Sequence, residues 1–94
     1  MRTVLLGDVV AAARALLAVP EAAQGPLLAR MLDQAHVAHH VHKRLGRPHP
    51  EWGNGSLMAR AAALPQAREP CASDPAYLAA LRVVIEGLLR RSLG

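Results

Sequence analysis

The chain has 94 residues, which allows one small domain and excludes a catalytic domain joined to a separate regulatory one. Apolar residues make up 52% of the chain, but many are alanine and Phe is absent, so Leu, Val, Ile and Met must build the core. A net charge of +4 favours acidic partners, and a single cysteine excludes an internal disulfide and favours a reducing cytoplasm.

The first predicted helix begins at Gly7 and Asp8 and ends before Pro20. Asp8 is its expected N-cap, because a carboxylate at that position accepts hydrogen bonds from backbone N–H groups of the first turn. Asp8 and Arg14 interrupt the apolar run, so we expect neither a removable secretory signal nor a membrane span here. The expected buried face consists of Val9, Val10, Ala13, Leu16 and Leu17.

The longest predicted helix continues without interruption from Leu27 to Arg44. Pro20 is expected to open a first turn, and Gly25 and Pro26 either break the helix or restart it with Pro26 in the first turn, where proline is tolerated. Gly46 is the expected residue after its last turn, where glycine suits a left-handed backbone. Prolines and glycines then predict a loop over residues 47–55.

A short helix over "LMARAAAL" is expected after Ser56 or Asn54 as its cap, with Pro65 stopping it. Asp74 and Pro75 predict the N-cap and first residue of the last helix. Its expected buried face consists of Tyr77, Leu81, Val84, Ile85 and Leu88, with Arg82, Glu86 and Arg90 opposite.

No segment alternates with period two, so the predicted fold class is all-α. We expect a small bundle of three main helices plus one short helix, in a single helical domain over residues 1–94. A long loop separates the second main helix from the short helix.

Two of the five histidines, His39 and His42, continue the apolar stripe of the long helix. We expect their carbon edges to pack while one nitrogen stays in water. The alternative is a half-buried pair that senses pH, because imidazole titrates near neutrality.

Asp33, His36 and His40 lie on another face of that helix. An HxxxH pair with a carboxylate three residues earlier is a weak metal candidate. Zinc needs a fourth ligand, and Lys43 on the same flank repels a cation, so a solvated polar face is the favoured interpretation. We therefore expect no metal and no cofactor.

The loop "GRPHPEWGNGS" contains the only tryptophan. Trp52 is expected to fill the core and pin the loop; the alternative is an exposed anchor for a partner. "GNGS" predicts a turn and a helix cap, with a weaker alternative in which its backbone binds an anion beside Arg47 and His49.

Lys43, Arg44 and Arg47 form a basic cluster that suits phosphate contacts. Against base recognition, the short helix offers only Arg60, and the loop before it is too long for a helix-turn-helix. No nucleophile, base and orienting group can be assembled, so the protein is not expected to be an enzyme.

The order "GDVVAAARALLAVP", "GRPHPEWGNGSLMARA", "EP" and "DPAYLAAL" resembles a family of short, uncharacterised helical proteins of alphaproteobacteria. The resemblance covers most of the chain, and "HPEWGNGSLM" is its most distinctive part. It implies a bacterial, cytoplasmic, helical protein and directs attention to residues 49–58. It transfers no activity and no binding residue.

We therefore expect a non-enzymatic interaction or regulatory module that binds a protein partner through the end of the long helix and the His49–Met58 loop. The alternative is a nucleic-acid-binding accessory protein that uses the basic cluster. No membrane partner is expected, and a homodimer would cover faces that alanine-rich helices leave open. The expected contact residues are Lys43, Arg44, Arg47, His49, Trp52 and Asn54.

Overall fold

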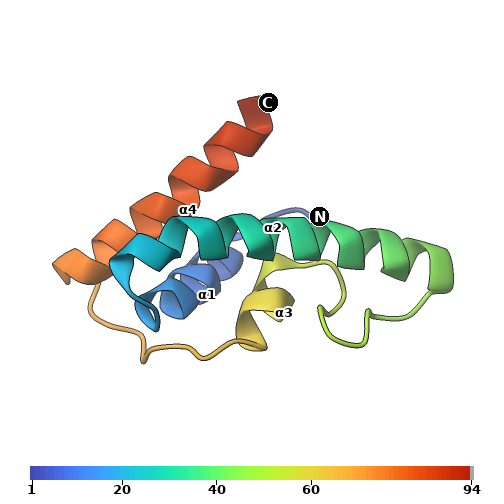
Figure 1. Cartoon of the computed structure of the whole chain (residues 1–94), viewed down its shortest axis with the longest axis horizontal. Coiled ribbons are helices and arrows are strands. Elements are labelled where there is room, and N and C mark those ends of the chain that lie inside the picture. The colour runs from blue at the N-terminus through green and yellow to red at the C-terminus, as the bar shows by residue number, and fades with distance from the viewer. Residues whose placement is uncertain (94) are drawn as a thin grey trace.

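The computed structural model describes residues 1–93, which form four α-helices. Figure 1 shows α2 along the length of the molecule, with α1 and α3 on one side of it. No strand occurs within these residues, and their isolated β-bridge pairs His49 with Gly53. The expected all-α arrangement of three main helices, one short helix and a long loop is confirmed. The helices are α1 (Leu6–Leu17), α2 (Glu21–Leu45), α3 (Leu57–Ala62) and α4 (Pro75–Leu93).

The core forms around α1, which contacts each of the other three helices. Alanines of α1 are fully buried and let the neighbouring backbones approach closely. Gly87 does the same for α4, since a Cβ there would lie 2.5 Å from Leu28 Cδ2 of α2. Each buried Leu-sized side chain contributes roughly 1.5–3 kcal/mol. The largest fully buried side chains are Leu16, Met31, Leu32, Leu57 and Val84.

Helix α1 begins two positions before the predicted cap, so the prediction that Asp8 is the N-cap is wrong. Leu5 is the N-cap and Asp8 lies at the third helical position. The Asp8 carboxylate reaches back, and its Oδ2 accepts a hydrogen bond from the Leu5 N–H at 2.8 Å. This is the reciprocal half of a capping box, and it satisfies a donor that the helix start leaves unpaired.

Helix α2 is one continuous helix, because Pro26 lies near its start rather than at a break. Pro20 is the N-cap residue. Gly25 precedes Pro26 and carries no Cβ that would clash with the proline ring. At the other end Gly46 has φ 69°, and its N–H donates to His42 O at 2.8 Å. The predicted left-handed glycine is confirmed.

The caps of the two later helices are confirmed. Ser56 Oγ accepts from the Ala59 N–H at 3.0 Å. Asp74 Oδ1 accepts from the Tyr77 N–H at 3.1 Å, with Pro75 as the first residue of α4. Helix α3 ends at Ala62, short of the predicted end, and Ala63 is its C-cap residue.

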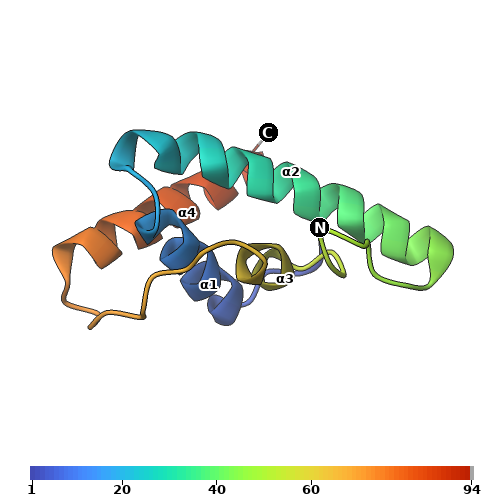
Figure 2. The same cartoon turned by 60° about the horizontal axis from the view of Figure 1, so that its bottom comes forward.

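The segment between α3 and α4 lies along α1, as the turned view in Figure 2 shows. Backbone hydrogen bonding joins Ala67 N–H to Arg14 O at 3.0 Å, and Arg14 Nε donates to Ala67 O at 2.9 Å. Gln66 adds a hydrogen bond to Ala11 O. This segment therefore has a defined place although it contains no helix.

Helix α4 packs through Tyr77, Ala80 and Val84, but Ile85 is 48% exposed. The prediction that Ile85 belongs to the buried face is wrong. Ile85 lies one residue beyond Val84 and is carried to the outer side, where Leu78 and Leu89 are also exposed. Among residues 1–93, no helix has the length and apolar character needed to cross a membrane.

Candidate binding groove at the start of helices α1 and α3

An open groove of about 700 Å³ lies where the N-terminal segment meets the starts of α1 and α3 and the second half of α2. We call it the N-terminal groove. Arg2 N–H donates to Gly55 O at 3.0 Å and thereby holds the N-terminal segment beside the loop before α3. The groove is lined by Met1, Arg2, Thr3, Leu5, Gly7, Asp8, His39, Lys43, Ser56 and Met58.

Asp8 holds the two helix starts together beneath the groove. Its side chain is buried, and Oδ1 accepts from the Met58 N–H at 2.8 Å while Oδ2 accepts from the Leu5 N–H. The Met58 side chain covers Gly7, where a Cβ would lie 2.7 Å from Met58 Cε. Both carboxylate oxygens are occupied by backbone donors, so Asp8 positions the groove.

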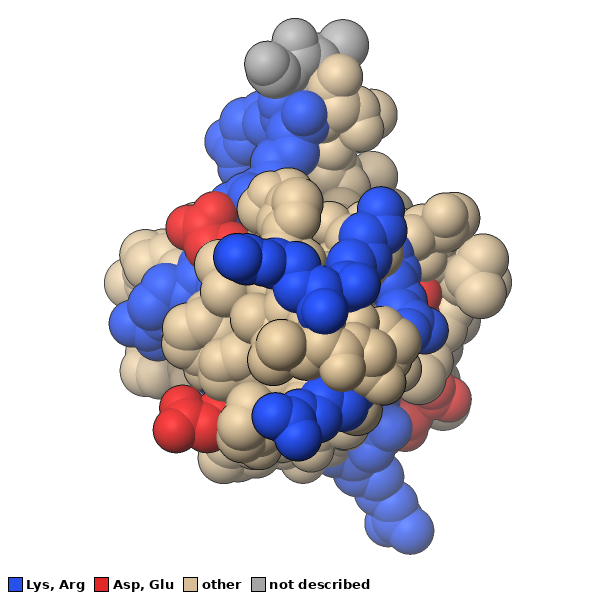
Figure 3. All heavy atoms as spheres, turned by 90° about the vertical axis from the view of Figure 1, so that its right-hand side faces the viewer, with Lys and Arg blue, Asp and Glu red and all other residues tan. Residues whose placement is uncertain are grey.

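The remaining lining combines exposed apolar groups with cations. Leu5 is 68% exposed and Met58 46% exposed, values that are high for side chains of this type. Arg2 and Lys43 also line the groove. The ion pairs of residues 1–93 involve other residues, so neither cation has a carboxylate in direct contact. The buried Asp8 carboxylate lies in the same lining and is hydrogen-bonded to backbone N–H groups. Figure 3 shows Lys and Arg side chains spread over this end of the molecule, with Asp and Glu side chains at its margins.

His39 forms part of the groove wall and is half-buried. Its Nδ1 is buried and has no hydrogen-bond partner within residues 1–93. Burial lowers the pKa of His39, and the N-terminal ammonium group and Lys43 lower it further. Both effects favour the neutral form of the ring.

His49 organises the turn before α3. Its Nδ1 accepts from the N–H groups of Glu51 and Trp52, each at 3.0 Å. The imidazole and indole rings stack with centroids 4.6 Å apart and an interplanar angle of 7°. Trp52 is half-buried and belongs to neither the core cluster nor the side chains packed against it. The prediction that Trp52 fills the core is wrong, because its neighbour His49 covers one ring face instead.

The "GNGS" segment is a tight turn that packs against α2. Asn54 Oδ1 accepts from the Ser56 N–H at 3.0 Å. Gly55 has φ 98°, and a Cβ there would lie 2.5 Å from His39 Cα. The N–H groups of Ser56, Met58 and Ala59 all have protein acceptors. These acceptors take three of the donors that an anion would use, and anion binding by this backbone stays an untested alternative.

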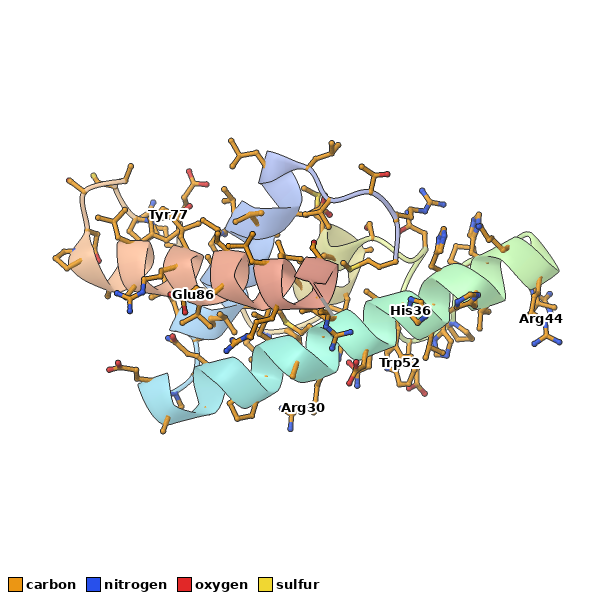
Figure 4. All side chains as sticks on the ribbon, turned by 90° about the horizontal axis from the view of Figure 1, so that it is seen from above. Arg30, His36, Arg44, Trp52, Tyr77 and Glu86 are labelled. Atoms are coloured by element: carbon orange, nitrogen blue, oxygen red, sulfur yellow. The ribbon has the colours of Figure 1, made fainter. Side chains whose placement is uncertain are left out.

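The basic cluster is spread over the end of α2. Lys43 faces the groove, whereas Arg44 lines a separate hollow of about 190 Å³ with Val41 and Leu45. Figure 4 shows Arg44 pointing away from the other helices. Arg47 is exposed in the turn after Gly46. Of the expected contact residues, only Lys43 lines the groove.

The histidine pair on α2 has no carboxylate partner. His36 and His40 are exposed, with their Nε2 atoms 3.2 Å apart and the rings edge to face. The N-terminal ammonium group is the largest cause that lowers the pKa of His36. Asp33 instead binds Arg91 of α4 at 2.6 Å. Within residues 1–93 no group of three or more His, Cys, Asp and Glu side chains is placed to hold a metal.

Sequence reasoning missed the contribution of residues 1–8 to the groove. It gave residues 1–5 no role and predicted Asp8 only as the cap of its own helix. The spacing of Leu5 and Asp8 is the signal that could have found it, because a carboxylate at the third helical position reaches back to the residue before the helix. That position leaves the other oxygen free to accept from α3.

Comparison with known proteins gives a family but no activity. A protein-family model described as "Domain of unknown function (DUF7742)" matches residues 2–88. No curated protein and no solved structure matches the chain. The resemblance to an uncharacterised family is confirmed in this form, and the alphaproteobacterial origin stays a prediction. Since the match covers nearly the whole chain, the protein belongs to the DUF7742 family.

Proposed function

We propose that the protein is a non-enzymatic binding module that holds a segment of a protein partner in the N-terminal groove. The observation that carries the proposal is the combination of exposed Leu5 and Met58 with Arg2 and Lys43, which form no ion pair within residues 1–93, around one groove. Apolar side chains in such a groove lose contact with water when a partner covers them. The interaction would act in the cytoplasm, where the exposed thiol of Cys71 would stay reduced.

The chemistry of the lining defines the partner segment. Its apolar side chains would pack on Leu5 and Met58, and its carboxylates would face Arg2 and Lys43. Unlike charges across an interface raise the association rate and disfavour wrong partners. We therefore propose an apolar segment flanked by Asp or Glu as the ligand of the groove.

Nucleic acid is the second candidate, and one observation favours it. Arg44 and Arg47 are exposed and have no carboxylate partner within residues 1–93, so both are available to phosphates. The geometry for base recognition is poor, because α3 has six residues and its Arg60 donates to Gln34 of α2. A protein segment uses both the apolar and the cationic parts of the groove, and is the better proposal.

Selection from a random peptide library on the immobilised protein tests the proposal. We expect enriched peptides to combine apolar residues with Asp or Glu. Fluorescence anisotropy of the best peptide then gives the affinity for the unchanged protein and for Lys43→Glu. Reversal of one interfacial charge should weaken binding about tenfold, equivalent to about 1.4 kcal/mol.

Arg30→Glu is the matched control, because Arg30 is exposed on the same helix and points away from the groove (Figure 4). It should leave peptide affinity unchanged. Equal weakening by both variants would reduce the effect to net charge and contradict the proposal. A steeply salt-dependent anisotropy signal with a DNA or RNA oligonucleotide, lost in an Arg44→Ala, Arg47→Ala double variant, would favour the second candidate instead.

A further inference from the structure

Helix α4 presents an apolar stripe to the outside of the molecule. Leu78, Ile85 and Leu89 are 49%, 48% and 56% exposed. At about 100° per residue these three side chains fall within about 40° of one direction. Tyr77 and Val84, through which α4 packs on the bundle, lie about 100–120° around the helix from this direction. The stripe is therefore a second apolar surface, separate from the N-terminal groove.

One flank of this stripe carries both signs of charge. Arg82 and Glu86 are 79% and 53% exposed, and their Nε and Oε1 atoms are 3.1 Å apart. Helical geometry places both on the same side of the line through Leu78 and Leu89. In an exposed position this ion pair contributes little to the stability of a single chain.

We propose that the stripe binds α4 of a second copy of this chain, antiparallel and about a two-fold axis. In such a pair each flank meets the same flank of the other copy, so Arg82 faces Glu86 of the second copy and Glu86 faces its Arg82. The same surface on the two copies is thus complementary in charge when the copies pair in this way. Of the two ion pairs within residues 1–93, Arg82–Glu86 is the one that lies within a single helix.

The spacing of the residues supports a single register. The midpoint between Arg82 and Glu86 lies at Val84, and the midpoint between Leu78 and Leu89 lies between Val83 and Val84. These two points differ by less than one helical step of about 1.5 Å. One register therefore brings Leu78 to Leu89 of the second copy and pairs the charges as well.

The shape of the molecule leaves room for this contact. Figure 1 shows the C-terminal turns of α4 extending beyond the other helices. The exposure of Leu78, Ile85 and Leu89 leaves the stripe itself uncovered. A stripe on one helix is smaller than a standard interface, which buries about 800 Å² on each partner. The dimer is consequently weak and concentration-dependent.

Sedimentation equilibrium of charge-reversal variants tests this register. Arg82→Glu and Glu86→Arg each place like charges opposite each other in both contacts, so each variant alone should be monomeric at concentrations where the unchanged protein dimerises. An equal mixture of the two variants restores both opposite-charge contacts. The mixture should recover dimers with at least a tenfold gain in association over either variant.

Leu89→Gln should also abolish association, while Arg30→Glu on α2 should leave it unchanged. Leu89 is exposed, so its replacement should leave the helical circular dichroism intact. A chain that remains monomeric at about 1 mM, the weak end of specific binding, overturns the proposal. Dimers that persist in both single variants, or a mixture that stays monomeric, overturn it too.

Discussion

The carboxylate of Asp8 in α1 accepts a hydrogen bond from the backbone N–H of Met58 in α3 at 2.8 Å, across 50 positions of sequence. The same carboxylate accepts from Leu5 N–H. Helix α3 has six residues, too few to be stable alone. Asp8 and the cap residue Ser56 together satisfy two donors at its start, and this makes the floor of the N-terminal groove depend on one buried side chain.

Asp8→Asn should destabilise the protein by about 1.5–3 kcal/mol, because an amide nitrogen would face one of two backbone donors and the charge would be lost. Urea unfolding followed by circular dichroism measures this. Asp33→Asn is the matched control, since Asp33 pairs with Arg91 at the surface with 69% of its side chain exposed. An equal loss in both variants would contradict a specific role for Asp8.

Gly55→Ala should cost more than Gly46→Ala. Both glycines have positive φ, which costs an L-residue about 1–2 kcal/mol. A Cβ at Gly46 meets open space, whereas one at Gly55 would lie 2.5 Å from His39 Cα. In Gly55→Ala this overpacking should increase the loss of unfolding free energy by about 1–3 kcal/mol, as measured by urea unfolding. Equal losses would mean that the loop moves away from α2 without cost.

Acidification should destabilise the protein through His39. Its pKa in the folded state is lowered, first by burial, so the unfolded chain binds the proton more tightly. Above the ordinary histidine pKa of about 6.5, this imidazole is neutral in both the folded and the unfolded state and does not change the free energy of unfolding. The free energy of unfolding falls as the pH drops through that value. The urea midpoint should decrease accordingly, with a shallower slope in His39→Gln. Titration of the imidazole protons by NMR should give a pKa for His39 below 6.5; a value above it would contradict this prediction.

His49→Ala should release the turn that holds Trp52. The variant loses the acceptor for two N–H groups and the stacked ring. The emission of the single tryptophan should therefore shift to longer wavelength. His49→Asn keeps a short acceptor for the turn and removes the stacking, so an intermediate shift is expected. An unchanged spectrum in His49→Ala would show that the turn is held by other contacts.

Local sequence signals predicted the fold well where one residue controls one helix end. Ser56, Asp74 and Gly46 act through groups within four residues of themselves, and all three were predicted. Asp8 was misplaced because half of its partners come from α3, which no local pattern reveals. Ile85 was misplaced because α4 is apolar on two sides, and only packing decides which side is buried.

The candidate site was predicted less well than the fold. The sequence directed attention to residues 49–58, and Ser56 and Met58 do line the groove. His49 and Asn54 turned out to hold the loop backbone, since their polar side chains have acceptor atoms that suit turns. The groove itself depends on the placement of the N-terminal segment, which is set by a contact between Arg2 and Gly55.

Helix α2 is buried only as far as Ala38, although it continues to Leu45. Its last turns are therefore held by their own backbone hydrogen bonds and by the loop that passes α2 at Gly55. Amide hydrogens there should exchange with solvent by local fraying, at a free energy well below that of global unfolding. Lys43 lies on this segment, so a ligand bound in the N-terminal groove would slow amide exchange in these last turns first. This protection would report occupancy of the groove before any change in melting temperature.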